Sequence, residues 1–250
     1  MEIVVIGMGY VGIPTAALLA DVDGFNVVGV QRRSKRSGWK IDHLNAGKSP
    51  IEGDEPGLAE LIEKVVGNGS FTVTEDVSVC KDADVILIVV QTPVDDNHVP
   101  QYTSLKEVSQ SIGQHMKKGS MVIIESTVAP GTTQYFVKPI LEELSGLKAG
   151  EDFNLVFSYE RVMAGRLLHN LRNMPKIVGG FTPACTERGV AFYKNIIQAE
   201  IYPTSTLTAE ISKITENAYR DVNIAFANEI ALICESLGVN VHEVRGLVNS

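Results

Sequence analysis

The feature that most constrains this chain is a glycine-rich turn close to its start. The apolar run Glu2–Ile6 is typical of a strand, and Gly7-Met8-Gly9-Tyr10-Val11-Gly12 then opens an apolar helix expected over Val11–Ala20. In that context the first glycine permits a tight turn, the second lets the backbone approach a pyrophosphate, and the third lets helix pack on strand. The helix N-terminus also favours an anion. The turn predicts a dinucleotide-binding α/β domain. The alternative is an ordinary strand–turn–helix connection that binds no ligand.

Short apolar runs alternate with longer helical patterns along most of the chain, which indicates a doubly wound parallel sheet of Rossmann type with crossover helices. Several runs, such as Val85–Val90, are apolar without alternation, as expected for strands covered on both faces. We expect strands at Glu2–Ile6, Phe25–Val30, Phe71–Val73, Val85–Val90, Met121–Glu125, Asn154–Ser158, Lys176–Val178 and Glu200–Pro203. Further helices are expected at Pro56–Val66, Leu105–Lys117, Thr132–Leu144 and Thr186–Ile196.

The pattern changes after Pro203. A helix is predicted over Thr206–Leu237, ended by Gly238, with a short helix over Val241–Val248. A helix of this length suggests a connector to a helical unit or a dimer contact. We therefore expect a cofactor-binding domain over 1–203 and, over 204–250, the long helix and the start of a helical dimerisation domain.

Composition narrows the class of partner. The chain has 22 Lys and Arg against 30 Asp and Glu, a formal net charge of −8, which argues against nucleic acid or an anionic membrane surface as a partner. It shows no apolar stretch long enough to cross a bilayer and no basic leader. Three cysteines without paired spacing and five scattered histidines indicate neither disulfides nor a metal site. A cytoplasmic protein is expected.

The residues after the second strand bear on which cofactor is bound. An NAD site usually has Asp or Glu there, to accept a hydrogen bond from the ribose 2′-hydroxyl. This chain has Gln31, followed by the basic segment Arg32-Arg33-Ser34-Lys35-Arg36. Guanidinium groups bind a 2′-phosphate through paired hydrogen bonds. The cofactor is therefore NAD or NADP, with NADP accepted as our hypothesis and a solvated basic loop as its alternative.

Four motifs in order resemble the UDP-sugar 6-dehydrogenases, within the UDP-glucose/GDP-mannose dehydrogenase family, over essentially the whole chain. They are the glycine turn, Gln91-Thr92-Pro93-Val94, Glu125-Ser126-Thr127-Val128-Ala129-Pro130-Gly131-Thr132, and Glu216-Asn217-Ala218-Tyr219-Arg220-Asp221-Val222-Asn223. Tyr159-Glu160-Arg161-Val162, together with Asn217–Arg220, is more similar to the branch acting on UDP-N-acetylhexosamines than to the UDP-glucose branch.

The resemblance implies that a sugar C6 hydroxymethyl is oxidised to a carboxylate while two nicotinamide cofactors are reduced in turn. It implies a UDP-sugar substrate, a homodimer through the long helix, and cofactor contacts from Gly7, Gly9, Tyr10, Val11, Gly12, Gln31, Arg32, Arg33, Thr92, Pro93, Ser126 and Thr127. Substrate contacts are implied for Glu160, Arg161, Val162, Lys213, Asn217 and Arg220.

The resemblance also implies four catalytic roles. Lys213 and Asn217 lie four residues apart, on one side of a helix, and would hold the oxygen being oxidised. Glu160 would act as general base, directly or through water, and Thr127 would position that water and the nicotinamide ring. Taken singly, each has a plainer interpretation: Lys213 as a solvated lysine, Asn217 as an exposed helix residue, Glu160 as a helix charge, and Thr127 as a turn residue.

Two departures qualify the resemblance. Ala164 stands where the UDP-glucose branch has a second glutamate. The family's nucleophilic cysteine belongs to a motif beyond residue 250, and Cys80, Cys185 and Cys234 have no neighbours that would activate a thiolate. We therefore expect the C-terminal UDP-binding domain to be absent and these residues to bind cofactor with little complete catalysis.

Two other functions fit the same pattern. A β-hydroxyacid dehydrogenase has this architecture and also uses a Lys-x-x-x-Asn pair, although Ser126–Thr132 and Glu160–Val162 fit it less well. A non-catalytic module that binds cofactor and dimerises is the other alternative.

Overall fold

The structure is a computed structural model that describes residues 1–35 and 37–250. Arg36, part of the basic segment considered above, lies outside the described residues. The chain divides into two compact units, Met1–Glu210 and Ile211–Ser250. Within the described residues no helix is both long enough and apolar enough to cross a membrane.

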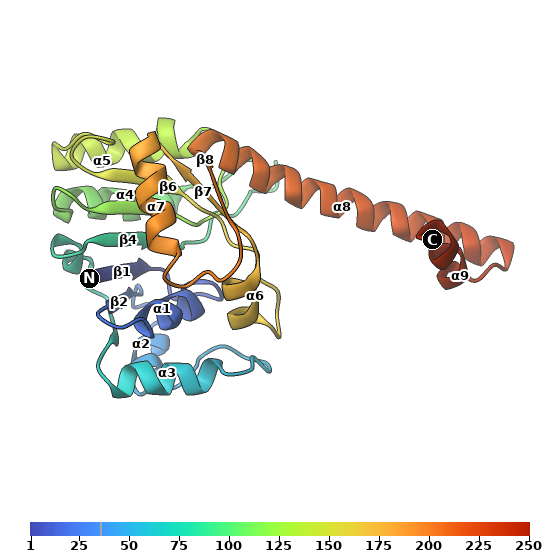
Figure 1. Cartoon of the computed structure of the whole chain (residues 1–250), viewed down its shortest axis with the longest axis horizontal. Coiled ribbons are helices and arrows are strands. Elements are labelled where there is room, and N and C mark those ends of the chain that lie inside the picture. Colours follow the sequence, from blue (N-terminus) through green and yellow to red (C-terminus); the bar gives the residue numbers. More distant parts are fainter. Residues whose placement is uncertain (36) are drawn as a thin grey trace. The chain divides into compact units, whose positions relative to one another are not determined.

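One sheet in the order β3-β2-β1-β4-β5-β6-β7-β8 forms the centre of the first unit (Figure 1). Its first six strands run parallel, in the order of a doubly wound dinucleotide-binding sheet. This confirms the predicted α/β fold class. The strands are β1 Glu2–Ile6, β2 Asn26–Val30, β3 Phe71–Thr74, β4 Val85–Ile88, β5 Met121–Ile124, β6 Asn154–Phe157, β7 Lys176–Gly180 and β8 Ile201–Ser205.

The direction of β7 corrects the prediction of a wholly parallel sheet. β7 pairs with β6 in the antiparallel sense, with Phe157 opposite Gly179, and β8 pairs parallel to β7. Between β6 and β7 the chain forms only the short helix α6 Leu167–Asn173. Because a parallel crossover needs a connection that returns to the other end of the sheet, this short connection instead lets β7 begin beyond the carboxyl end of β6.

Alternating residues of each strand contribute to two cores, one on each face of the sheet. Ile3 and Val5 join the cluster covered by α1 Gly12–Ala20, α2 Trp39–Asn45, α3 Leu58–Gly67, α6 and α7 Pro183–Tyr193. Val4 and Ile6 join the cluster covered by η1 Val77–Lys81, α4 Thr103–His115, η2 Thr133–Val137 and α5 Lys138–Ser145. Burial on both faces explains why the strands are apolar without alternation.

Three short elements were not predicted: α2, η1 and α6. Each lies between the predicted elements, and each contributes few residues to the core, such as Ile41 and Leu44 from α2. Periodicity needs a longer window than these helices provide.

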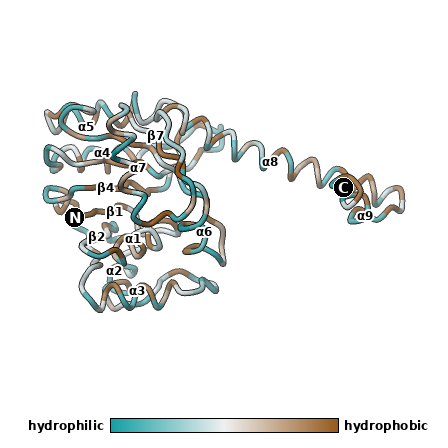
Figure 2. The backbone as a smooth tube through the Cα atoms, viewed as in Figure 1, coloured by the Kyte–Doolittle hydropathy of each residue, from teal (hydrophilic) through white to brown (hydrophobic). Residues whose placement is uncertain are grey.

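The long helix and the short helix after it have the predicted bounds, α8 Thr206–Leu237 and α9 Val241–Val248. Gly238 ends α8 with a φ of +66°, a left-handed conformation that glycine adopts without strain. In the second unit, α8 exposes large apolar side chains, among them Tyr219, Val222 and Phe226. Figure 2 shows hydrophobic positions recurring along this helix.

Candidate cofactor-binding and catalytic site

The glycine turn after β1 has the geometry of a phosphate-binding turn. Gly7 adopts a φ of +111°, and a Cβ there would lie 2.3 Å from the Val89 carbonyl oxygen. A Cβ at Gly12 would lie 1.9 Å from the Gly7 carbonyl oxygen. A Cβ at Gly9 would meet no atom within 4 Å, so the backbone there faces open space. The outer two glycines are required by packing, whereas Gly9 leaves room for a ligand.

The N-terminus of the helix that follows the turn has free groups that could bind an anion. α1 begins after Val11 without a hydrogen bond from a capping side chain, and all of its residues are buried. An uncapped N-terminus leaves backbone N–H groups for a ligand. Together with the open backbone at Gly9, this fits the pyrophosphate of a dinucleotide, which Gly7, Gly9 and Gly12 would hold.

Gln31 lies beside this turn, at the end of β2. The Met8 backbone N–H donates to its Oε1 at 3.2 Å, and its Nε2 donates to Ser37 Oγ at 3.1 Å. Lys40 Nζ donates to the Met8 carbonyl at 3.2 Å. The side chain of Gln31 is thus oriented at the position where dinucleotide-binding domains usually carry an acid.

The two arginines after Gln31 are engaged by surface acids. Arg33 lies 3.4 Å from Asp42 and 3.6 Å from Glu75, and the hydrogen bond with Asp42 raises its pKa. Arg32 lies 3.5 Å from Glu107. Such exposed pairs contribute little to stability, so they leave both guanidinium groups able to exchange partners.

The loops after β4 and β5 are tied together at the carboxyl edge of the sheet. Thr92 Oγ1 donates to the Thr127 carbonyl at 2.5 Å, and Ser126 Oγ donates to the Val90 carbonyl at 2.7 Å. The side chain of Thr127 is exposed, as is Pro93. Ligands bind at this edge in open α/β sheets, which puts these residues on the same side as the glycine turn.

Glu160 follows β6 and belongs to a buried charged cluster. Lys176 Nζ contacts Glu160 Oε1 and lies 3.3 Å from Glu125 Oε1. The Tyr193 hydroxyl donates to the same Glu125 oxygen at 2.6 Å. The side chains of Lys176, Glu125 and Glu160 are 3%, 0% and 9% exposed. Burial, followed by the charge and the hydrogen bond of Glu125, raises the pKa of Tyr193 well above its ordinary value.

Sequence reasoning selected Glu160 but missed its three buried neighbours. The available signal was Lys176 itself, a lysine heading the apolar run Ile177-Val178. A charged residue is almost never fully buried unless it is paired. Glu125 was predicted as the end of a strand, and Tyr193 lies within the helix predicted over Thr186–Ile196.

Arg161 and Val162 hold the segment after Glu160. Arg161 donates to the Pro175 carbonyl at 2.7 Å and to the Tyr159 hydroxyl at 3.0 Å. Val162 is half-buried and packs against the core on the α1 face. The contacts described for Arg161 and Val162 therefore fix the segment that follows Glu160.

A second missed residue, Glu55, joins that loop to the glycine turn. The Tyr10 hydroxyl donates to Glu55 at 2.6 Å, as does the backbone N–H of Gly165, and the Leu167 N–H donates at 3.0 Å. Partial desolvation of Glu55 opposes its ionisation, but these hydrogen bonds outweigh that effect and lower its pKa. Tyr10, named above as a cofactor contact, is 40% exposed.

The remaining predicted residues lie on α8 in the second unit. Lys213 is half-buried, while Asn217 and Arg220 are exposed. Their spacing of four and three residues places them along one side of the helix. Arg220 Nη2 donates to Glu216 at 3.3 Å.

The cysteines are packing residues. Cys80, Cys185 and Cys234 are all buried and unbonded to one another. Burial, with a smaller contribution from Asp76, raises the pKa of Cys80 to about 12. Its thiol is therefore protonated at neutral pH and is not a nucleophile.

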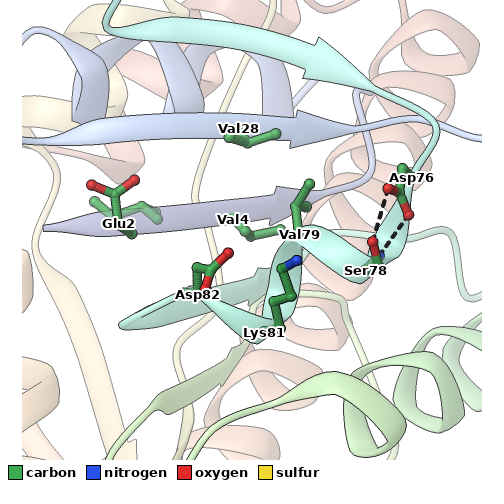
Figure 3. A pocket seen from close by; sticks show the side chains of 10 residues that line it. Glu2, Val4, Val28, Asp76, Ser78, Val79, Lys81 and Asp82 are labelled. Carbon is green, nitrogen blue, oxygen red and sulfur yellow. Dashed lines mark hydrogen bonds between the residues drawn. The ribbon is translucent and has the colours of Figure 1, made fainter.

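A hollow of about 330 Å³ lies elsewhere, between η1 and the sheet (Figure 3). Val4, Val28 and Val79 line it, and Asp76 accepts two hydrogen bonds from Ser78 at its rim. It includes Glu2, the first residue of β1, and Ala83, which precedes β4, so it reaches the amino-terminal ends of these strands. None of the predicted site residues lines it.

Comparison with known proteins agrees with this arrangement. Residues 1–197 match the model of the UDP-glucose/GDP-mannose dehydrogenase family, NAD binding domain, and residues 207–250 match the central domain of that family. The chain belongs to the UDP-glucose/GDP-mannose dehydrogenase family, and its first part is the NAD binding domain of that family.

Individual relatives show which members of the family this chain is similar to. The chain is 38% identical to a UDP-N-acetyl-D-mannosamine dehydrogenase of Pyrococcus horikoshii over 250 residues, which are 100% of this chain and 58% of the relative. The solved UDP-D-ManNAc dehydrogenase of Pyrococcus horikoshii gives a TM-score of 0.92 at 38% identity, covering 100% of this chain and 57% of that one.

A second solved structure, an NDP-N-acetyl-D-galactosaminuronic acid dehydrogenase from Methanosarcina mazei Go1, is 47% identical with a TM-score of 0.88. The alignment covers 99% of this chain and 53% of that one. The chain thus spans a little over half the length of the relatives that it matches.

Proposed function

We propose that this chain supplies the cofactor-binding domain and the first helical part of a UDP-N-acetylhexosamine 6-dehydrogenase, of the UDP-N-acetyl-D-mannosamine type. The enzyme would oxidise the C6 hydroxymethyl to the uronate with two equivalents of NAD+ or NADP+. The observation that carries this proposal is the convergence of the glycine turn, Thr127 and Glu160 on one edge of the sheet, in a chain of this family.

When bound, the nicotinamide cofactor accepts a hydride from the sugar carbon. The turn Gly7–Gly12, with Gln31, Thr92, Pro93 and Ser126, would bind and orient it. Thr127 is exposed, its carbonyl accepts the hydrogen bond from Thr92, and its hydroxyl would position water there. Glu160 would take the proton of that water as general base. Its carboxylate is already ordered by Lys176.

Lys213 and Asn217 are proposed to hold the oxygen that is oxidised. A lysine ammonium stabilises a developing alkoxide, and an amide four residues further along the helix can donate to the same oxygen. Arg220, with Arg161 and Val162, would contact the nucleotide sugar. These roles are inferred from the family motifs.

The N-acetylhexosamine branch is favoured over UDP-glucose for two reasons. Ala164 replaces the second glutamate of the UDP-glucose branch, and the first relatives given above are named for N-acetylated sugars. Both mannosamine and galactosamine configurations occur among those names.

We further propose that residues 1–203 act as the NAD(P)-binding domain in the cytoplasm and that residues 204–250 begin a helical domain through which the protein dimerises. Within its own span the chain would bind cofactor but not complete the oxidation, because no described cysteine is suited to form a thioester.

The decisive experiment measures nicotinamide reduction by absorbance with UDP-N-acetylmannosamine, UDP-N-acetylgalactosamine, UDP-glucose and short 3-hydroxy acids. It is run on this chain and on any longer product of the same gene, with cofactor binding followed by calorimetry. We expect cofactor binding by the chain and uronate formation only by the longer form with N-acetylated substrates. Oxidation of 3-hydroxy acids would instead support a β-hydroxyacid dehydrogenase, and binding without any turnover would support a non-catalytic module.

A further inference from the structure

We propose that Lys176 is the positioning residue for Glu160: it holds the Glu160 carboxylate at the reactive edge and is itself anchored by Glu125 and Tyr193. The proposal rests on the proposed function only in giving Glu160 a chemical role. The geometric part, that Lys176 controls Glu160, can be tested separately.

The reversed strand explains how a residue on β7 reaches this edge. In β6 and β7, Phe157 lies opposite Gly179, so continuing the antiparallel register by three residues brings position 160 opposite position 176. A strand parallel to β6 would carry its last residue to the carboxyl edge, whereas β7 carries its first. The Ser158 hydroxyl donates to the Ile177 carbonyl at 2.8 Å, which fixes the two segments at this level.

Groups other than Glu160 also hold Lys176 in place. Its ammonium lies 3.3 Å from Glu125 Oε1 and 4.5 Å from the centre of the Tyr193 ring. Its backbone N–H donates to the Glu200 carbonyl at 3.0 Å, within the β7–β8 pairing. A side chain held by a carboxylate, a ring and its own strand has little rotational freedom left, so the carboxylate it binds is also fixed.

Charge explains why the cation is needed. Two carboxylates and one ammonium meet in a cluster in which the lysine is 3% exposed. Glu125 Oε2 has no hydrogen-bond partner among the described residues, so Lys176 and Tyr193, both at Oε1, carry its stabilisation. Without the ammonium, two buried carboxylates would face each other, which disfavours ionisation of both. Lys176 therefore keeps Glu160 ionised and able to accept a proton.

The groups that face Glu160 come from several elements. Lys176 lies on β7, Glu125 follows β5, and Tyr193 ends α7. Tyr159 and Arg161 flank Glu160 in sequence, and the Arg161 guanidinium lies over the Tyr159 ring. Lys176 contacts the Glu160 carboxylate directly, so its removal is an informative change.

The experiment follows the Glu160 side-chain carboxyl by carbon NMR in the full 250-residue chain, with the signal assigned by its loss in Glu160→Gln. Titrations compare the parent with Lys176→Met and Lys176→Arg. We expect the Glu160 titration to move to higher pH by roughly one unit or more in Lys176→Met, as for loss of an adjacent opposite charge, and to return towards the parent in Lys176→Arg. The control, Lys117→Met, removes the half-exposed partner of Asp84 and should leave Glu160 unchanged.

Lys176→Met alone could prevent folding, because it leaves two buried carboxylates together. The double variant Lys176→Met/Glu125→Gln avoids this, since it retains one negative charge, the same net charge as the parent cluster. We expect the double variant to fold. Its Glu160 carboxyl signal should broaden or shift, because Lys176 no longer holds that carboxylate. A folded Lys176→Met, or a folded double variant, with a Glu160 titration and line shape like the parent would overturn the proposal.

Turnover by a longer form of the protein provides a separate readout. We expect Lys176→Arg to retain turnover and the double variant to lower kcat about tenfold or more with KM nearly unchanged, with the pH profile displaced in the same direction as the NMR titration. If Glu160→Gln leaves turnover intact, the proposed base is wrong, while the NMR result still decides whether Lys176 positions it.

Discussion

Oε2 of Glu210 lies 2.6 Å from the backbone nitrogen of Gly131, which precedes it by 79 residues. Its other oxygen accepts the Thr133 N–H at 2.8 Å, and the side chain is fully buried. Gly131 and Thr133 are at the start of the helical segment that includes η2 and α5, so one carboxylate satisfies two donors of a helix N-terminus. The first turn of α8 is thereby part of the first unit.

Replacing Glu210 should be among the most destabilising single changes in the chain. Glu210→Ala leaves two buried N–H groups without partners, and we expect the free energy of unfolding to fall by roughly 2–5 kcal/mol. Glu210→Gln retains one acceptor oxygen and should lose about half as much. Urea denaturation followed by circular dichroism measures both; the exposed Glu60→Ala should change it by less than ~0.5 kcal/mol. A loss for Glu210→Ala no larger than for Glu60→Ala would contradict this role.

Two glycines of the same turn should respond differently to one methyl group. Gly12→Ala forces a contact with the Gly7 carbonyl and should cost roughly 1–3 kcal/mol of stability as well as cofactor binding. Gly9→Ala meets nothing within 4 Å and should fold within ~0.5 kcal/mol of the parent while cofactor affinity falls at least about tenfold. Thermal melts and calorimetric titration separate the effects. Unchanged affinity in Gly9→Ala would remove this backbone from the binding site.

The arginines after β2 should discriminate between cofactors. If NADP is accepted, Arg33→Ala or Arg32→Ala should weaken NADP binding about tenfold, the loss of a charge-assisted hydrogen bond, and leave NAD within about twofold. Asp42→Asn frees Arg33 from its ion pair and should strengthen NADP binding. Calorimetric Kd values for both cofactors, with Lys48→Ala as the exposed control, measure this. Equal effects on NAD and NADP would favour a merely solvated basic loop.

Acid should destabilise the first unit partly through Asp84. The hydrogen bond from Lys117, together with the Glu2 backbone N–H, lowers the pKa of Asp84. Because the pKa is lower in the folded state, its stabilisation is present above about pH 4 and is lost as pH falls through the native value. Asp84→Asn should therefore flatten the decline in unfolding free energy below about pH 5. The exposed Asp54→Asn should not, and an identical slope in both variants would argue against this account.

The apolar side chains of α8 should drive self-association. Phe226 is 65% exposed and Val222 66% exposed in the chain alone, which is unusual for large apolar residues unless a partner covers them. We expect sedimentation to give a dimer and Phe226→Glu to shift it towards monomer by at least about tenfold in Kd. Asn228→Glu adds the same charge at an exposed polar position of the helix and serves as the control. A monomeric parent would leave α8 without the proposed role.

Much of this fold follows from local pattern. The strands are short apolar runs bounded by glycine, proline and charged residues, and the length of α8 is evident from the lack of helix breakers between Thr206 and Gly238. The glycine turn was predictable because its spacing has a steric reason at each position. These signals depend only on residues that are close together in the sequence, so they can be recognised without knowing how the elements pack.

The charged cluster of Lys176, Glu125 and Glu160 was harder to predict, because it depends on the direction in which β7 runs. The run Lys176–Gly180 reads the same whether its strand is parallel or antiparallel, and only the antiparallel pairing brings Lys176 beside Glu160. Likewise Glu55 shows nothing in its own segment that indicates Tyr10 and Gly165 as its partners. Such long-range pairs form when elements pack, which periodicity does not encode.

The reversal of β7 also bears on how this segment can change in evolution. Because side chains alternate along a strand, inserting or deleting one residue between Lys176 and Gly180 would turn the lysine to the opposite face. The connection before it, which includes α6, can vary in length without that effect. We therefore expect homologous genes to tolerate length variation before position 176 and to avoid it within the four residues that follow.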